Sequence, residues 1–152
     1  MRLLYKFAHG ILSLLRRGKV TLGVRALLID NGRVLLVKHT YLPHWYLPGG
    51  GINKGENPMK ALRRELREEI SINLTRDPEL LGFYYNDLEK RNDYIAVYVC
   101  HHFDGVAKIA PEEFEVEKIG WFELEDLPST LSPGTQRRIG EFLKTKNYND
   151  KW

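Results

Sequence analysis

The segment GGGINKGENPMKALRRELREEI (residues 49–70) places a glycine-rich loop directly before a helical pattern. Pro58 suits the first turn of a helix, and large apolar side chains then recur every three or four residues, as on one helical face. These side chains are Met59, Leu62, Leu66 and Ile70. The spacing predicts a helix from about Pro58 to Ile70, with an apolar face that packs on a sheet.

Runs of β-branched, aromatic and leucine residues predict the strands of that sheet. Asn31-Gly32 separates two such runs, 20–30 and 33–39, and this dipeptide is the strongest short signal for a β-hairpin. Further strands are expected within residues 79–87, 93–103 and 114–124, and a short helix within residues 134–145. This order of elements predicts an α/β sandwich with a mixed β-sheet rather than a doubly wound parallel sheet.

The composition favours one globular domain that binds a small anionic ligand. The chain has 152 residues, a length that supports one hydrophobic core. Its net charge of +3 is mildly basic and lacks the dense positive surface of nucleic-acid binders, so we expect no nucleic-acid partner. The single cysteine, Cys100, excludes an intrachain disulfide and favours a buried thiol and a reducing, cytoplasmic location.

Both ends of the chain are expected to lie outside the domain, which we place at residues 20–146. Apolar side chains recur at helical spacing in residues 1–19, but polar residues interrupt them before the roughly 20 residues that a membrane-spanning helix needs. The pattern predicts an amphipathic helical arm that packs on its own domain or pairs two subunits in a homodimer. Binding to an anionic membrane surface is the alternative. The polar tail, residues 147–152, is expected to fray.

Three acidic side chains, Glu65, Glu68 and Glu69, lie on the predicted helix at the spacing i, i+3 and i+4. Their carboxylates converge on one patch, where like charges repel unless a cation compensates. Oxygen ligands at this density suit Mg²⁺ or Mn²⁺ better than Zn²⁺. The alternative is a solvated helix face, on which Arg64 and Glu68 form a helix-supporting pair.

Loop and helix together resemble the Nudix box, Gly-x5-Glu-x7-Arg-Glu-U-x-Glu-Glu-x-Gly-U, in which U is a bulky aliphatic residue. The matching residues are Gly50, Glu56, Arg64, Glu65, Leu66, Glu68, Glu69 and Ile72. The one departure is Ser71, where the box has a glycine that ends the helix in a left-handed conformation. Because serine adopts that conformation less readily, we expect a shifted helix end, with Asn73 able to take the left-handed position.

The resemblance implies a Nudix-type α/β/α sandwich and a metal-dependent pyrophosphohydrolase. Its substrate would be a nucleoside diphosphate linked to another moiety, such as a nucleotide sugar or a nucleoside triphosphate. The implied ligands of Mg²⁺ or Mn²⁺ are Glu65, Glu68, Glu69 and Gly50. The implied catalytic residues are the same three glutamates and Arg64, and the implied structural residues are Gly49, Gly51 and Glu56, the last as the partner of Arg64.

The attacking water must lose a proton, and the sequence leaves the acceptor open. Glu68 or Glu69 can supply it; in some members of the family the base lies in a loop before the last strands, here at Glu112, Glu113 and Glu115. For Glu112 and Glu113 a solvated loop is the favoured interpretation.

Cations and aromatic planes near the box are candidates for substrate binding, because a nucleotide offers a diphosphate and a base that can stack. The candidates are Arg25, Lys38, Tyr41, Tyr46, Tyr84 and Tyr85. The residues that mark many ADP-ribose and dinucleoside polyphosphate hydrolases of the family are absent, so the substrate stays open. Two other functions remain: a regulator that binds a nucleotide without cleaving it, and a peripheral membrane hydrolase of lipid-linked pyrophosphates.

Overall fold

The computed structural model describes residues 20–86 and 92–152, and all structural statements below concern these residues. The arm predicted for residues 1–19 lies outside them. Within the described ranges, no helix combines the length and the apolar composition needed to cross a membrane.

The first two strands form the predicted hairpin. Strand β1 (Val20–Asp30) pairs antiparallel with β2 (Arg33–His39), with Ile29 opposite Val34. Asn31 and Gly32 both have positive φ angles, 48° and 78°, as a two-residue type I′ turn requires. The hairpin prediction is therefore confirmed.

Six strands form one mixed sheet. Beside β1 and β2 it contains β3 (Trp45–Tyr46), β5 (Glu79–Asn86), β6 (Asn92–Cys100) and β8 (Val116–Glu123). The order is β3-β2-β1-β6-β5, and β8 pairs with β2. Only the β1–β6 pairing within these described strands is parallel. Two short strands, β4 (Asn73–Leu74) and β7 (Phe103–Asp104), pair separately.

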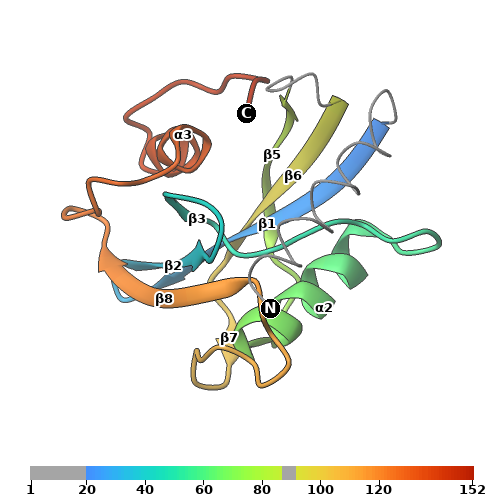
Figure 1. The fold of residues 1–152 in the computed structure, drawn as a ribbon. Coiled ribbons are helices and arrows are strands. Elements are labelled where there is room, and N and C mark those ends of the chain that lie inside the picture. Colours follow the sequence, from blue (N-terminus) through green and yellow to red (C-terminus); the bar gives the residue numbers. More distant parts are fainter. Residues whose placement is uncertain (1–19, 87–91) are drawn as a thin grey trace.

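Two helices cover the two faces of the sheet, as Figure 1 shows. Side chains of β1 alternate between the faces: Val24 and Ala26 pack in the cluster that includes helix α2 (Pro58–Ile70), whereas Leu27 packs in the cluster that includes α3 (Pro133–Phe142). This layering confirms the predicted α/β/α sandwich. Cys100 is buried, also as predicted.

Helix α2 begins and ends with recognisable caps. The Asn57 side chain accepts the Lys60 N–H at 2.9 Å. At the other end Ser71 itself adopts the left-handed conformation, with φ 59° and ψ 29°, and the Ile72 N–H donates to the Leu66 carbonyl at 3.1 Å. The prediction of a shifted helix end was therefore wrong, because Ser71 closes the helix without Asn73, which lies in β4.

Replacing Ser71 by glycine is expected to stabilise the protein by about 0.5–1 kcal/mol. Glycine adopts the left-handed conformation without a Cβ penalty, although it also loses more backbone freedom on folding. Urea unfolding measures the change, and Ser71→Ala is the matched control, since alanine keeps the Cβ and gives no gain. A glycine variant less stable than the wild type would contradict this assignment of the cap.

The C-terminal tail does not fray. The Tyr85 N–H donates to the Asp150 carbonyl at 2.7 Å, and the Trp152 N–H donates to the Tyr85 carbonyl at 2.8 Å, so the tail runs along the free edge of β5. The Tyr148 hydroxyl adds a hydrogen bond to the Phe83 carbonyl at 3.0 Å. The sequence prediction was wrong here because pairing at a sheet edge uses backbone groups, which a polar composition does not reveal.

Candidate active site

Arg64 connects the glycine-rich loop to α2. Its Nε and Nη2 donate to the two carboxylate oxygens of Glu56, each at 2.9 Å, and Nη2 also donates to the Gly51 carbonyl at 2.9 Å. Its Nη1 donates to Glu65 at 2.7 Å. The Arg64 hydrogen bonds, together with the Asn53 N–H, lower the pKa of Glu56 to about 2. Arg64 therefore holds the loop against the helix, as the resemblance implied.

Glu69 is a buried carboxylate that faces the loop backbone. It is 7% exposed, and its Oε2 accepts the Gly49 N–H at 2.8 Å. Burial raises the Glu69 pKa to about 8, against the Gly49 hydrogen bond and the positive charge of Arg25. Gly49 has φ 129°, and a Cβ there would meet the Val24 carbonyl at 2.3 Å, so this close approach requires glycine.

Glu65 lies directly against Gly50. A Cβ on Gly50 would stand 2.5 Å from the Glu65 carboxylate, so the glycine makes room for the side chain. Burial raises the Glu65 pKa, the Arg64 hydrogen bond opposes that shift, and the negative charge of Glu68 adds to it. The glutamates of the box therefore lie close enough to repel one another.

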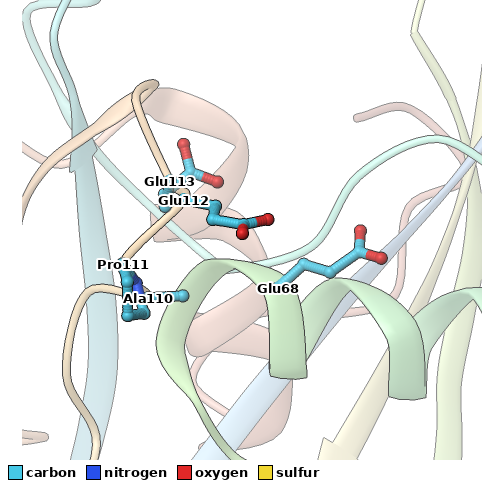
Figure 2. A pocket seen from close by; sticks show the side chains of 5 residues that line it. All are labelled: Glu68, Ala110, Pro111, Glu112 and Glu113. Carbon is cyan, nitrogen blue, oxygen red and sulfur yellow. The ribbon is translucent and has the colours of Figure 1, made fainter.

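Glu68 is the most exposed of these glutamates and faces an open pocket of about 430 Å³. The pocket is lined by Glu68, Ala110, Pro111, Glu112 and Glu113. Figure 2 shows Glu112 and Glu113 on the loop opposite α2, with Glu112 extending toward the helix. Glu112 is exposed and Glu113 half-buried, so this loop carries acidic groups to the edge of the box.

The last turn of α2 fixes the base of that loop. The Lys108 N–H donates to the Ile70 carbonyl and the Ala110 N–H donates to the Glu69 carbonyl, both at 3.1 Å. Carbonyl groups at a helix end lack partners within the helix, and the loop supplies them. The position of the pocket relative to the box thus follows from backbone hydrogen bonds.

The donor atoms of the site suit a hard divalent cation. Carboxylate oxygens are the ligands that Mg²⁺ and Mn²⁺ prefer, and burial, which raises the pKa of Glu65 and of Glu69, disfavours their charged forms unless a cation compensates. Among residues 20–86 and 92–152, however, no three His, Cys, Asp or Glu side chains form a ready metal-binding group. The three glutamates have different partners instead: Gly49 for Glu69, and Arg64 for Glu65 and Glu68.

The predicted substrate-binding residues Arg25, Lys38 and Tyr46 differ in their position relative to the box. Arg25 is half-buried, and its positive charge lowers the pKa of both Glu65 and Glu69, so its guanidinium lies near the box glutamates. Lys38 lies on β2 opposite Lys118 of β8. Tyr46 is half-buried, and its ring centroid lies 5.7 Å from that of His39.

Tyr84 requires a correction. It is 0% exposed, lies in the core cluster on the α3 side of the sheet, and donates its hydroxyl to Glu141 at 2.8 Å. Helix α2 and the box lie on the opposite side. Tyr84 therefore supports the core and does not contact a substrate. Tyr85, the other candidate on β5, pairs instead with Tyr94 and with the tail.

The sequence did not reveal a contact between Tyr41 and Glu115. The Tyr41 hydroxyl donates to Glu115 Oε2 at 3.1 Å, although 74 positions separate the two residues. The contact depends on the pairing of β2 with β8, which brings His39 opposite Val116. No local pattern signals such a pair; only the tertiary fold creates it.

Comparison with known proteins identifies the family. The NUDIX domain profile matches residues 19–144. A Bartonella clarridgeiae protein named RNA pyrophosphohydrolase is 32% identical over 147 residues, which cover 84% of this chain and 81% of the relative. The crystal structure of a MutT NUDIX hydrolase from Burkholderia pseudomallei is 31% identical, with a TM-score of 0.73 over 81% of this chain and 98% of the other.

A more distant relative is the m7GpppN-mRNA hydrolase of Saccharomyces cerevisiae, 28% identical over 117 residues; the match spans 74% of this chain and 12% of the yeast protein. The family profile covers most of the chain, so this protein belongs to the Nudix hydrolase family, whose members act on phosphoanhydride bonds and use divalent metal ions. The resemblance of the box, the fold and the class of enzyme are thereby confirmed.

Proposed function

We propose that this protein is an Mg²⁺-dependent pyrophosphohydrolase of nucleoside 5′-polyphosphates. The observation that carries the proposal is the packing of two carboxylates, the buried Glu69 and the half-buried Glu65, against the backbone of Gly49 and Gly50. Burial raises the pKa of both carboxylates, so a divalent cation stabilises their charged forms, and a diphosphate needs the same cation to offset its own charge.

Each residue of the site then has a chemical task. Glu65, Glu68 and Glu69 would hold the cation, which, when bound, neutralises phosphate charge and lowers the pKa of a water molecule. Arg64 holds the loop and the helix in register through Glu56 and Gly51. Mn²⁺ is expected to substitute for Mg²⁺, because the donors are the same hard oxygens.

Arg25 would bind the phosphate chain. The charge of Arg25 already lowers the pKa of both Glu65 and Glu69, so a phosphate bound beside these carboxylates lies within reach of that charge. Lys38 is not part of this proposal, because Leu35 and Val37 of β2 pack on the α2 side and alternation directs Lys38 to the α3 side of the sheet.

A polyphosphate at the 5′ end of RNA is a second candidate substrate. The Bartonella clarridgeiae relative is named for activity on RNA. The mild net charge predicts no nucleic-acid partner, but recognition of one terminal polyphosphate requires only a few cations rather than a long basic surface. Nucleotides of the RNA beyond the first one would then contribute little to its affinity for the protein.

A panel of substrates tests the proposal. Nucleoside triphosphates, a short 5′-triphosphorylated RNA, a nucleotide sugar and ADP-ribose are assayed for phosphate or nucleotide release with Mg²⁺, Mn²⁺ or a chelator. Metal-dependent release from a 5′-polyphosphate supports the proposal. Thermal stabilisation by a nucleotide with no turnover of any substrate would replace it with the regulator that binds without cleaving.

The amphipathic arm at residues 1–19 stays a prediction, and so does the alternative that this arm binds an anionic membrane surface. A deletion tests both. If the protein acts on lipid-linked pyrophosphates, it binds anionic vesicles, and deletion of residues 1–19 abolishes that binding. If the arm pairs two subunits, the same deletion changes the mass measured in solution.

Replacing Arg64 by lysine is expected to lower kcat/KM about 10- to 100-fold, because lysine cannot bind both Glu56 oxygens and Gly51 together. The apparent affinity for Mg²⁺ falls with it, and a metal titration of the activity measures both. Arg67→Lys, on the exposed side of the same helix, is the control and keeps wild-type kinetics. Equal kinetics for Arg64→Lys and Arg67→Lys would show that the bidentate contact is dispensable.

A further inference from the structure

Residues 148–152 lie on a surface formed by strand β5 and helix α3, and Figure 1 shows the chain returning from α3 to the end of β5. Strand β5 is at one end of the strand order, so its outer backbone groups can pair with another extended segment. The tail pairs with them as a parallel strand does, with the Asp150 carbonyl and the Trp152 N–H both bonded to Tyr85. This is the geometry in which a sheet edge binds a peptide by strand addition.

Helix α3 contributes two charged side chains that bind the tail backbone, Arg138 and Glu141, which are 0% and 6% exposed. Arg138 Nη1 donates to the Lys151 carbonyl at 3.0 Å. Glu141 accepts the Asn149 N–H at 3.1 Å, and Arg138 holds its carboxylate through an ion pair of 2.9 Å. Because an unpaired buried donor or acceptor is costly, these two groups favour a segment that presents a carbonyl and an N–H at these positions.

Trp152 is the tail side chain that packs against the core. Its ring centroid lies 6.2 Å from that of Tyr84 and 5.7 Å from the guanidinium carbon of Arg138. Gly134 lies in the first turn of α3, and a Cβ there would stand 2.4 Å from the indole Nε1. Glycine weakens a helix relative to alanine, so the space that the indole needs explains Gly134. The tail site is formed by Tyr85, Gly134, Arg138 and Glu141.

The connection between α3 and the tail has a different role. Thr145 and Lys146 donate their backbone N–H groups to the Gly140 carbonyl, at 2.9 and 3.2 Å, and so close the end of the helix. Recognition of the tail site resides in the backbone groups and the indole of residues 148–152. Covalent attachment adds a high local concentration, which keeps the segment bound to its own domain.

We propose that the tail site is a peptide-binding site, and that the tail of a second copy of this chain occupies it when the resident tail is displaced. The contacts require an extended segment with a tryptophan two residues after the carbonyl that accepts the Tyr85 N–H. A second copy supplies this segment with identical chemistry, so an exchange of tails preserves the contacts of the closed monomer. The tail site lies on the α3 side of the sheet, and the inference does not depend on the hydrolase activity.

Two full-length variants separate the tail from its site. Trp152→Ala removes the indole and opens the tail site, whereas Gly134→Ala fills the indole space and keeps the tail intact. A labelled peptide with the sequence of residues 146–152 is titrated against each variant by fluorescence anisotropy. It should bind Trp152→Ala about tenfold more tightly than it binds Gly134→Ala or the wild type, whose own tail competes. A control peptide with alanine in place of the tryptophan should bind Trp152→Ala about tenfold more weakly.

A mixture of the two variants tests exchange between copies. Gly134→Ala supplies a tail and Trp152→Ala supplies a site, so native mass spectrometry should show heterodimers in excess over both homodimers. Association through another surface, such as the arm at residues 1–19, gives heterodimers and homodimers in statistical proportion. The double variant lacks both the tail and the site, and it is the control that forms no such excess with either single variant.

Urea unfolding establishes that each variant folds, and Trp152→Leu, which keeps part of the apolar volume, replaces Trp152→Ala if that variant does not. Failure of the folded Trp152 variant to bind the peptide overturns the inference, and so do heterodimers in no more than statistical proportion. Equal binding of the peptide by Gly134→Ala overturns it as well, since the peptide then binds another surface. An inactive enzyme with these binding results intact overturns only the proposed function.

Discussion

Replacing Glu69 by glutamine is expected to lower kcat about 10²- to 10⁴-fold in the presence of Mg²⁺. Glu69 is 7% exposed and accepts the Gly49 N–H, so its carboxylate is offered to a cation at a fixed position rather than on a solvated surface. Glutamine has the same size and its amide oxygen can still accept that N–H. The substitution therefore removes the charge and preserves the shape of the site.

Binding and stability measurements separate loss of the charge from loss of the fold. Without metal, Glu69→Gln is expected to melt no lower than the wild type, because burial raises the pKa of Glu69 to about 8 and the neutral amide replaces a side chain whose charged form is already disfavoured. Addition of Mg²⁺ should raise the melting temperature of the wild type and leave that of the variant nearly unchanged. Glu79→Gln, on an exposed end of β5, is the control. Activity of Glu69→Gln within threefold of the wild type would remove Glu69 from the metal site.

The sequence correctly predicted those parts of the fold that depend on interactions between residues close together in the chain. The turn at Asn31-Gly32 follows from the positive φ angles that these residues tolerate. The start of α2 follows from Asn57 and Pro58, and its apolar face from the helical repeat. The box was recognisable for the same reason, because all of its residues lie on one loop and one helix.

The errors arose where long-range pairing overrides local preference. Ser71 adopts a left-handed conformation although serine disfavours it, because the chain must leave α2 and enter β4 two residues later. On β5 the register shifts between Leu80 and Gly82, so simple alternation does not assign Tyr84 to a face. Whether that tyrosine faced the substrate or the core depended on a bulge that no residue type announces.

The convergence of the three box glutamates was predicted only in part. Helical spacing placed Glu65, Glu68 and Glu69 on one surface, and their mutual effects on pKa agree with that. Spacing does not determine side-chain rotamers, however. In the structure Arg64 donates hydrogen bonds to two of the three carboxylates, those of Glu65 and Glu68. The partners across the loop, such as Glu115 with Tyr41, required the folded sheet.

Replacing Arg138 by methionine is expected to destabilise the protein by about 3–5 kcal/mol, the usual cost of removing one partner from a buried ion pair. Arg138 is 0% exposed, and its Nη2 donates to Glu141 at 2.9 Å. Its guanidinium lies 3.7 Å from the centroid of the Tyr84 ring. Methionine fills much of the volume but leaves the Glu141 carboxylate buried without its cation.

The C-terminal tail is expected to loosen in the same variant. Arg138 Nη1 donates to the Lys151 carbonyl at 3.0 Å, and Glu141, its ion-pair partner, accepts the Asn149 N–H at 3.1 Å. Hydrogen exchange of the Trp152 amide, which pairs with Tyr85, should therefore become faster. Arg76→Ala, at an exposed loop position, is the control and changes stability by no more than about 0.5 kcal/mol.

A double-mutant cycle with Glu141→Gln tests whether the charge pair is the cause. If it is, Arg138→Met costs less in the Glu141→Gln background, since no unpaired carboxylate remains. Equal costs in both backgrounds would assign the loss to packing against Tyr84 alone. Because this cluster lies on the α3 side of the sheet, kcat/KM below the melting temperature should be unchanged by Arg138→Met. Glu69→Gln should instead lower kcat/KM and leave the stability of the metal-free protein nearly unchanged. Residues on the α3 side of the sheet would then determine stability, and residues on the α2 side would determine catalysis.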